Sequence, residues 1–253
     1  MGVVKLVMKK TLFTVQSSRM LTSDVFELRL AGDAADFTKP GQFVEISVPG
    51  LFLRRPISVC DWSDDSLLLL IKAVGSGTAA LRDLQPGTAL DVLTGLGNGF
   101  DVAAAPSATV CLVGGGIGVA PLYALAKELL SAGQKVIAVL GFRSSADLFY
   151  ADEFRSLCCE VRIATEDGSC GTKGFVTDVL KELPECSYVY ACGPLPMLKA
   201  VAALPQVKSG QFSLEARMGC GFGACVGCTV KTVGGPKRVC KEGPVFAKEE
   251  LVW

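Results

Sequence analysis

Four cysteines near the C-terminus have a spacing that suits iron–sulfur chemistry. Four residues separate Cys220 from Cys225, two separate Cys225 from Cys228, and eleven separate Cys228 from Cys240. Three closely spaced thiolates can hold one side of a [2Fe–2S] cluster while a distant fourth returns on a loop. The spacing therefore predicts a [2Fe–2S] cluster with Cys220, Cys225, Cys228 and Cys240 as ligands.

The residues between these cysteines suit a cluster. Gly219, Gly221, Gly223, Ala224 and Gly227 are small, so backbone amides can approach the cluster sulfurs and tune the reduction potential by hydrogen bonding. A structural zinc site is the alternative, and its usual pattern is two short pairs of ligands, often with histidine. This chain has no histidine and no second pair. The pattern favours the cluster over zinc or disulfides.

The composition limits the classes of function. The chain has 253 residues, enough for two ordinary domains and a small appendix. Its 25 basic and 25 acidic side chains balance, which argues against a broad nucleic-acid-binding surface. The lack of histidine excludes Ser-His-Asp and Cys-His catalysis and a Rieske-type cluster. We therefore assign no catalytic acid or base.

Hydropathy and cysteine use indicate the compartment. Half of the residues are apolar, yet no apolar run approaches the length of a membrane span, and residues 1–10 lack the pattern of an export signal. Eleven cysteines in such a chain favour a reducing compartment, where thiols bind metals or stay buried rather than pair. We expect a cytoplasmic protein without membrane contact. Seven cysteines outside the cluster motif show no ligand spacing and are expected in core or loop positions: 60, 111, 158, 159, 170, 186 and 192.

Short β-type runs alternate with turns over the first hundred residues. Strands are expected at 13–15, 25–30, 42–48 and 67–72, with Pro-Gly turns at 40–41, 49–50 and 86–87. Closely spaced strands with such turns predict an antiparallel barrel or sandwich.

The pattern changes after Pro106 to an alternation of buried strands and helices. Strands are expected at 108–113, 135–142, 160–164 and 188–192, and helices at 121–130, 151–157, 177–183 and 197–204. This alternation predicts crossover units on a parallel sheet. The cysteine-rich tail from about residue 211 is too short to build a core alone, so the cluster would replace one.

Two turns lie where this sheet could bind a nucleotide. Gly114, Gly115, Gly116 and Gly118 join a strand to a helix, where a pyrophosphate can approach the amides of the helix N-terminus. The run departs from the usual dinucleotide fingerprint, and such turns also simply close a strand–helix corner. The segment Cys192-Gly193-Pro194 follows another strand of the sheet, at the edge where ligands bind, although Cys192 equally fits a small strand-end residue.

Two segments of the first domain could bind a flavin. The run Arg54-Arg55-Pro56-Ile57-Ser58 offers guanidinium groups for a pyrophosphate and a hydroxyl for the flavin ring, but paired arginines also fit a solvated strand edge. The run 75–79 equally fits a hairpin turn or a phosphate-binding loop that leads into a short helix at 79–84.

Taken in order, these motifs resemble the ferredoxin reductase superfamily, whose members pair a flavin-binding barrel with a nicotinamide-binding α/β domain. The motifs that carry the resemblance are Arg55-Pro56-Ile57-Ser58, Gly77-Thr78, 114–122 and 192–197. Segments 165–169 and 174–178, with the cysteine tail, resemble one branch, the electron-transfer subunits of NAD-dependent dihydroorotate dehydrogenases. The resemblance covers essentially the whole chain.

The resemblance implies three parts: an antiparallel β-barrel FAD domain (1–104), an α/β parallel-sheet NAD domain (105–210) and a small C-terminal [2Fe–2S] subdomain (211–253). FAD would contact Arg55, Pro56, Ile57, Ser58, Leu70, Ile71, Lys72, Gly77 and Thr78. NAD would contact Gly114, Gly115, Gly116, Gly118, Cys192, Gly193 and Pro194.

The same resemblance implies a role in pyrimidine synthesis. Electrons would pass from the FMN of a separate dihydroorotate dehydrogenase catalytic subunit, present in equal number in a complex with two of each chain, through the cluster and FAD to NAD⁺. A flavin suits this position because it exchanges both hydrides and single electrons.

Three questions remain open at the level of sequence. The chain could instead be a diaphorase-type subunit of a hydrogenase or a ferredoxin:NAD(P) oxidoreductase, because these proteins have a similar architecture. A zinc-stabilised nucleotide-binding regulatory protein is an alternative of another class. Preference for NAD or NADP is also open, because Arg143-Ser144-Ser145 could meet a 2′-phosphate or form a solvated loop.

Overall fold

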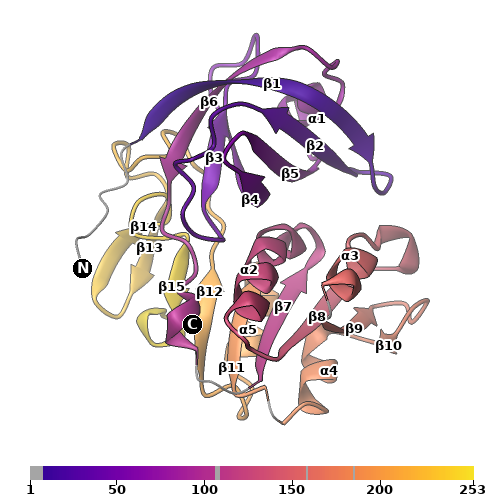
Figure 1. The fold of residues 1–253 in the computed structure, drawn as a ribbon. Coiled ribbons are helices and arrows are strands. Elements are labelled where there is room, and N and C mark those ends of the chain that lie inside the picture. Colours follow the sequence, from indigo (N-terminus) through magenta and orange to yellow (C-terminus); the bar gives the residue numbers. More distant parts are fainter. Residues whose placement is uncertain (1–7, 106–108, 158, 185) are drawn as a thin grey trace.

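The protein is described by a computed structural model over residues 8–105, 109–157, 159–184 and 186–253. Within these ranges a closed β-barrel stands above a seven-stranded sheet flanked by helices (Figure 1). A hairpin of β13 (Thr229–Thr232) and β14 (Gly235–Arg238) lies beside them. Residues 1–7 of the expected barrel domain, the first residue of the strand expected at 108–113 and Cys158 lie outside the described residues.

The first domain is the predicted antiparallel barrel. Its strands follow the order β1-β2-β5-β4-β3-β6. Along β1, buried and exposed side chains alternate, as a strand with one face on a core requires. Strand β6 was not predicted, and α1 (Ser76–Arg82) begins three residues before the expected helix. The strands are β1 (Lys9–Met20), β2 (Val25–Ala31), β3 (Phe43–Ile46), β4 (Arg55–Ser63), β5 (Ser66–Lys72) and β6 (Ala89–Leu96).

The second domain is the predicted α/β unit, with the sheet order β10-β9-β8-β7-β11-β12-β15. Neighbouring strands are parallel from β10 to β12. The strands are β7 (Val110–Gly115), β8 (Val136–Phe142), β9 (Glu160–Thr165), β10 (Thr172–Lys173), β11 (Tyr188–Cys192), β12 (Ser209–Ser213) and β15 (Val245–Ala247). The helices are α2 (Ala120–Ser131), α3 (Ala151–Ser156), α4 (Val176–Lys181) and α5 (Leu195–Ala202), with short 3₁₀ turns at 102–104, 116–119, 145–147 and 248–250.

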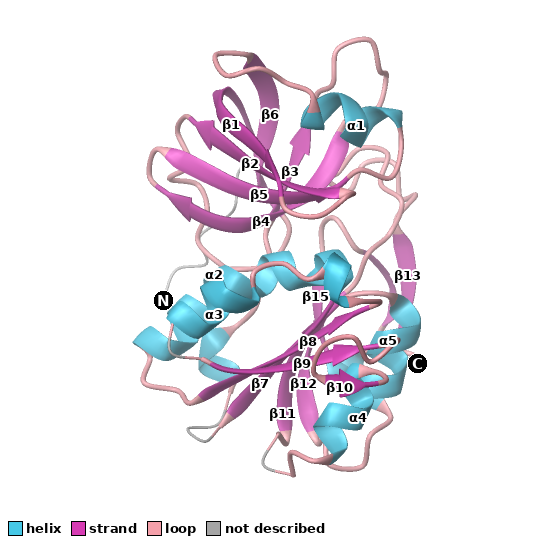
Figure 2. Cartoon of the chain, turned by 90° about the vertical axis from the view of Figure 1, so that its right-hand side faces the viewer, coloured by secondary structure: helices cyan, strands magenta, loops and turns pink. Residues whose placement is uncertain are grey.

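Helices cover both faces of this sheet, with α2 and α3 on one side and α4 and α5 on the other (Figure 2). Along β7, Val110 and Leu112 belong to one buried cluster, whereas Cys111 and Val113 belong to the other. A strand buried on both faces is apolar at every position, which explains the continuous apolar runs in the sequence.

The cysteine-bearing tail is joined to the sheet. Strand β15 pairs antiparallel with β12, and β12 itself runs across residue 210, where the sequence suggested a domain boundary. Cys228, Cys240 and Phe246 pack in the same buried cluster as Val113 of β7. The tail therefore shares the core of the α/β domain.

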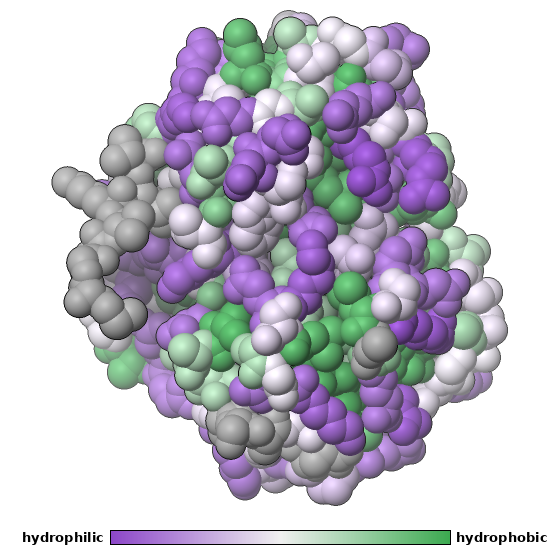
Figure 3. Space-filling model, in the orientation of Figure 1, coloured by the Kyte–Doolittle hydropathy of each residue, from purple (hydrophilic) through white to green (hydrophobic). Residues whose placement is uncertain are grey.

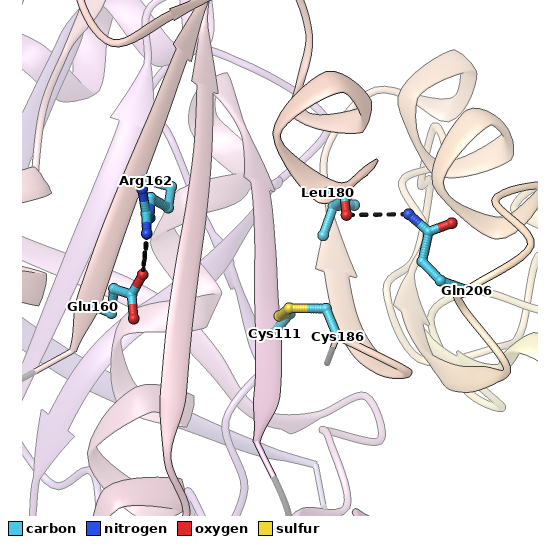
Figure 4. The surroundings of a disulfide bond; sticks show 6 residues. All are labelled: Cys111, Glu160, Arg162, Leu180, Cys186 and Gln206. Atoms are coloured by element: carbon cyan, nitrogen blue, oxygen red, sulfur yellow. Dashed lines mark hydrogen bonds and ion pairs between the residues drawn. A yellow bond between two sulfur atoms is a disulfide. The ribbon is translucent and has the colours of Figure 1, made fainter. Parts of the chain in front are cut away.

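One pair of cysteines departs from the expectation that thiols stay unpaired. Cys111 of β7 and Cys186, in the segment before β11, form a disulfide with 5.5 Å between their Cα atoms (Figure 4). The parallel pairing of β7 with β11 brings the two positions together, although 75 residues separate them in sequence. Sequence spacing cannot show such a contact.

Polar contacts join the barrel to the α/β domain. Lys127 of α2 pairs with Asp61 of β4 at 2.7 Å, and the hydroxyl of Tyr150 donates to Glu27 of β2 at 2.8 Å. In Figure 3, polar side chains cover much of the visible face and hydrophobic ones gather on its lower half. Across the described ranges, every helix is too short or too polar to cross a membrane.

Candidate functional site

The four predicted cluster ligands come together as two pairs. The amides of Ala224 and Cys225 donate to the sulfur of Cys220 at 3.2 and 3.4 Å, and the amide of Cys240 donates to the sulfur of Cys228 at 3.4 Å. Cys225 is exposed, whereas Cys228 and Cys240 are buried. Among the described residues, no three side chains of His, Cys, Asp or Glu are arranged as ligands of a single metal ion.

The electrostatics of the pairs suit a metal cluster. Burial opposes ionisation of Cys220, but amide hydrogen bonds from Cys225, Phe222 and Ala224 lower its pKa to about 6. Burial, followed by the neighbouring Cys228, raises the pKa of Cys240 to about 12. The buried Cys240 thiol therefore resists ionisation unless a positive centre lies beside it. The donor set therefore fits a group that binds several thiolates at once.

A buried carboxyl group of the barrel contacts the cysteine loop. Glu45 of β3 is 1% exposed, and a Cβ atom added to Gly221 would come within 2.5 Å of its side chain. Gly221 has φ +77°, a conformation that favours glycine. The contact joins the barrel directly to the loop between Cys220 and Cys225.

A cavity of about 550 Å³, the inter-domain cavity, lies between the barrel, the glycine turn and the cysteine-bearing tail. Seven of the nine residues predicted to contact FAD line it: Pro56, Ile57, Ser58, Leu70, Ile71, Lys72 and Thr78. Arg55 and Gly77 do not line the cavity but contact each other, because the space beside Gly77 is filled by the guanidinium group of Arg55. The structure thus brings seven of the nine predicted flavin residues to one cavity.

A second cavity of about 560 Å³, the sheet-edge cavity, lies at the carboxyl ends of β7, β8 and β9. Of the predicted NAD residues, Gly115, Gly116 and Pro194 line it, while Gly118 and Cys192 line the inter-domain cavity. Gly114 and Gly193 line neither cavity.

These glycines are needed where two turns meet. A Cβ atom on Gly118 would collide with the backbone carbonyl of Cys192, and one on Gly193 would lie 3.0 Å from the amide nitrogen of Gly115. The two turns predicted separately are therefore packed against each other, and only small residues permit this approach.

Several lining residues were not predicted. Ser213 and Glu215 line the inter-domain cavity just after β12, and burial raises the pKa of the Glu215 carboxyl. Asp147 lines the sheet-edge cavity, and hydrogen bonding from Ser144 chiefly lowers the pKa of its carboxyl. Ser213 and Glu215 could have been found from the rule that ligands bind beyond the carboxyl ends of parallel strands. Asp147 offered no signal, because its position depends on a 3₁₀ turn.

Two family models match the chain. Residues 112–203 match the oxidoreductase NAD-binding domain, and residues 215–252 match the iron-sulfur cluster binding domain of dihydroorotate dehydrogenase B. The second match includes all four paired cysteines and favours an iron–sulfur cluster over zinc.

Among solved structures, the chain is similar to an NADH-dependent reduced ferredoxin-NADP oxidoreductase, with TM-score 0.86 and 31% identity over 100% of this chain and 92% of that one. It shares its fold with a ferredoxin reductase of carbazole 1,9a-dioxygenase, with TM-score 0.66 and 24% identity over 77% and 64% of the two chains. The fold and the two cavities define an oxidoreductase subunit of the ferredoxin reductase type.

Curated relatives narrow this class. The electron transfer subunit of dihydroorotate dehydrogenase B (NAD(+)) from Bacillus caldolyticus is 45% identical over 94% of this chain and 97% of its own length. The subunit of the same name from Listeria innocua is 43% identical over 96% and 99%. The chain belongs to the family of dihydroorotate dehydrogenase B electron transfer subunits.

Proposed function

We propose that this chain carries electrons between a dihydroorotate dehydrogenase catalytic subunit and NAD⁺, by way of a [2Fe–2S] cluster and FAD. The observation that supports it most is the contact of the two cavities, which share Lys72, Gly115, Gly116, Ile117 and Pro194. When bound, FAD would exchange the hydride of the nicotinamide for the single electrons of the cluster. Reacting groups in adjoining cavities meet the proximity that such transfer needs.

In this proposal the barrel residues bind and orient FAD. Arg55, beside the N-terminus of α1, supplies positive charge for the pyrophosphate. Ser58, Leu70 and Thr78 line the cavity around the flavin ring, where mostly apolar walls exclude water. Gly115 and Gly116, which line both cavities, allow the nicotinamide nucleotide to approach the backbone, and Gly118 lines the inter-domain cavity beside them.

The tail residues hold the cluster near the surface. Cys220, Cys225, Cys228 and Cys240 are the proposed ligands, and exposed Cys225 marks the side nearest solvent. Phe222 and Val226, 42% and 60% exposed, flank it. We infer that this face meets an FMN-containing catalytic subunit, in a complex with two of each chain, because electron transfer needs the cluster close to its partner. The proposed location is the cytoplasm.

Reconstitution tests the function directly. The purified chain should contain FAD, iron and acid-labile sulfide, and with the catalytic subunit it should support dihydroorotate-dependent reduction of NAD⁺. The similarity to the NADH-dependent ferredoxin-NADP oxidoreductase favours a second candidate, ferredoxin-linked reduction of a nicotinamide nucleotide. Activity with reduced ferredoxin but not with the catalytic subunit would favour that candidate instead.

A pair of variants tests the assigned cofactor sites. Cys225→Ser should abolish the iron–sulfur absorbance while FAD content and NADH-to-dye activity stay near wild type, because Cys225 lies outside the inter-domain cavity. Arg55→Ala should weaken FAD retention while the iron–sulfur absorbance stays near wild type. Loss of FAD from Cys225→Ser, or unchanged FAD retention in Arg55→Ala, would contradict the division of roles.

A further inference from the structure

Given the proposed function, the two cavities determine the orientation of the bound NAD(H). Hydride transfer requires the nicotinamide at the flavin, so the nicotinamide belongs where the sheet-edge cavity adjoins the inter-domain cavity. The diphosphate then lies at the glycine turn, as expected for a nucleotide at a strand–helix turn. The adenosine half extends to the opposite end of the sheet-edge cavity, toward β8 and β9.

Side chains from three segments line this far end: Arg143 after β8, Asp147 in the following 3₁₀ turn, Glu166 after β9, and Phe175 before α4. Two hydrogen bonds tie the loops together. The amide of Ser145 donates to the hydroxyl of Ser169 at 2.7 Å, and the amide of Asp167 donates to the carbonyl of Arg143 at 3.3 Å. The far end is therefore a built site rather than two independent loops.

Asp147 occupies the groups that could otherwise hold a 2′-phosphate. Its Oδ1 atom pairs with the guanidinium group of Arg143 at 3.1 Å, and its Oδ2 atom accepts from the hydroxyl of Ser144 at 2.8 Å. The Asp147 side chain is 23% exposed, and the 3₁₀ turn 145–147 directs it back toward Arg143. Arg143 and Ser144, which the sequence left as a possible phosphate site, are already engaged by this carboxylate.

The charges at the far end favour an unphosphorylated ribose. The carboxylates of Asp147 and Glu166 line the cavity with the single guanidinium group of Arg143. A 2′-phosphate brings close to two negative charges, whereas a ribose hydroxyl can donate to a carboxylate. We propose that Asp147 is the residue that makes this site accept NAD(H) and reject NADP(H), an inference that rests on the proposed nicotinamide site.

Binding of two matched probes to the holoprotein tests this role without catalysis. The probes are 5′-AMP and adenosine 2′,5′-bisphosphate, which differ only by the 2′-phosphate, and calorimetry gives their dissociation constants. The wild-type protein should favour 5′-AMP. Asp147→Ser should reduce this preference about tenfold or more, because it removes a like charge and frees Arg143. Asp147→Asn, which keeps the size of the side chain, should change the preference in the same direction.

Two further variants separate the local effect from a general change in charge. Asp152→Ala removes the same charge five residues along the chain, where the side chain is 93% exposed and pairs with Arg155, and should leave the preference unchanged. In Asp147→Ser/Arg143→Ala the gain for the bisphosphate should largely disappear, because the freed guanidinium group is gone. NADH and NADPH oxidation should follow the same order.

The outcomes distinguish failure of the role of Asp147 from failure of the proposed nicotinamide site on which it rests. A wild-type preference retained in both Asp147→Ser and Asp147→Asn, with the flavin and cluster absorbance intact, would overturn the role of Asp147 alone. An equal change in Asp152→Ala would also overturn it. If neither probe bound the wild-type protein and NADH were not oxidised, the nicotinamide site itself would be wrong.

Discussion

Burial of the Glu45 carboxyl group costs the folded protein some stability. Its carboxyl group is buried, and its Oε1 atom has no hydrogen-bond partner within the described part of the chain. Burial is the main cause that raises its pKa to about 7; Arg54 opposes the shift and the charge of Cys220 adds to it. The buried group therefore stays largely protonated at mildly acidic pH, where an ordinary glutamate is ionised.

Replacing Glu45 should stabilise the protein more as the pH rises. The folded-state pKa of about 7 exceeds the ordinary value of 4.5, so the protonated group stabilises the folded state below pH 4.5 and this contribution is lost as the pH rises through 7. The loss amounts to at most about 3 kcal/mol. Glu45→Gln avoids it, and its thermal midpoint relative to wild type should increase between pH 5 and pH 8. A difference independent of pH would contradict the assignment.

Among the elements, the cysteine loop requires glycine at one position. Gly221 combines φ +77° with a close approach to Glu45, whereas Gly234, between β13 and β14, has open space around its Cα atom. An added methyl group is therefore costly at the first position and tolerated at the second.

Gly221→Ala should destabilise the cysteine loop by about 1–3 kcal/mol, through left-handed backbone strain and collision with Glu45. Loss of iron–sulfur absorbance on heating should occur at a lower temperature than in wild type. Gly234→Ala is the matched control and should behave like wild type. Equal midpoints for the two variants would show that the loop tolerates the added methyl group.

The elements also show what the sequence could predict. Strands β7, β8, β9 and β11 and the four helices of the α/β domain were predicted within a few residues, because strands buried on both faces give continuous apolar runs. Strands β10, β12 and β15 were not predicted. Strand β15 has only three residues, which carry no periodic signal, and it is defined only by its pairing with β12. The two glycine turns could be recognised in the sequence because glycine is required where they pack together, whereas Asp147 is brought to Arg143 only by a 3₁₀ turn.

At the scale of the whole molecule, polar contacts hold the two domains around the cavities. Tyr150, with φ +63°, places its hydroxyl on Glu27, which also pairs with Arg19 and Arg29. The neighbouring Tyr123 packs edge-on against the Tyr150 ring, with 5.4 Å between centroids. The hydrogen bond from Tyr150 is therefore a defined link between barrel and sheet.

Tyr150→Phe should remove this link and keep the ring packing. Losing a hydrogen bond to a charged group costs about 1.5–3 kcal/mol, which corresponds to a fall of several degrees in thermal midpoint for a chain of this size. Tyr123→Phe, whose hydroxyl has no hydrogen bond among the described residues, is the control and should change the midpoint less. Calorimetry of the two holoproteins measures both, and equal midpoints would contradict the proposed link.

The antiparallel strand β15 also affects how the chain is protected while the ribosome synthesises it. It covers the outer edge of β12, and an open strand edge invites pairing with another chain. Because β12 ends at Ser213 and β15 begins only at Val245, this edge stays open on the nascent chain until the cysteine-bearing segment between them has been synthesised. A chain released before β15 is made would carry a nearly complete nucleotide-binding domain with an exposed, aggregation-prone edge. Protection from self-association therefore depends on a segment made well after the strand that it covers.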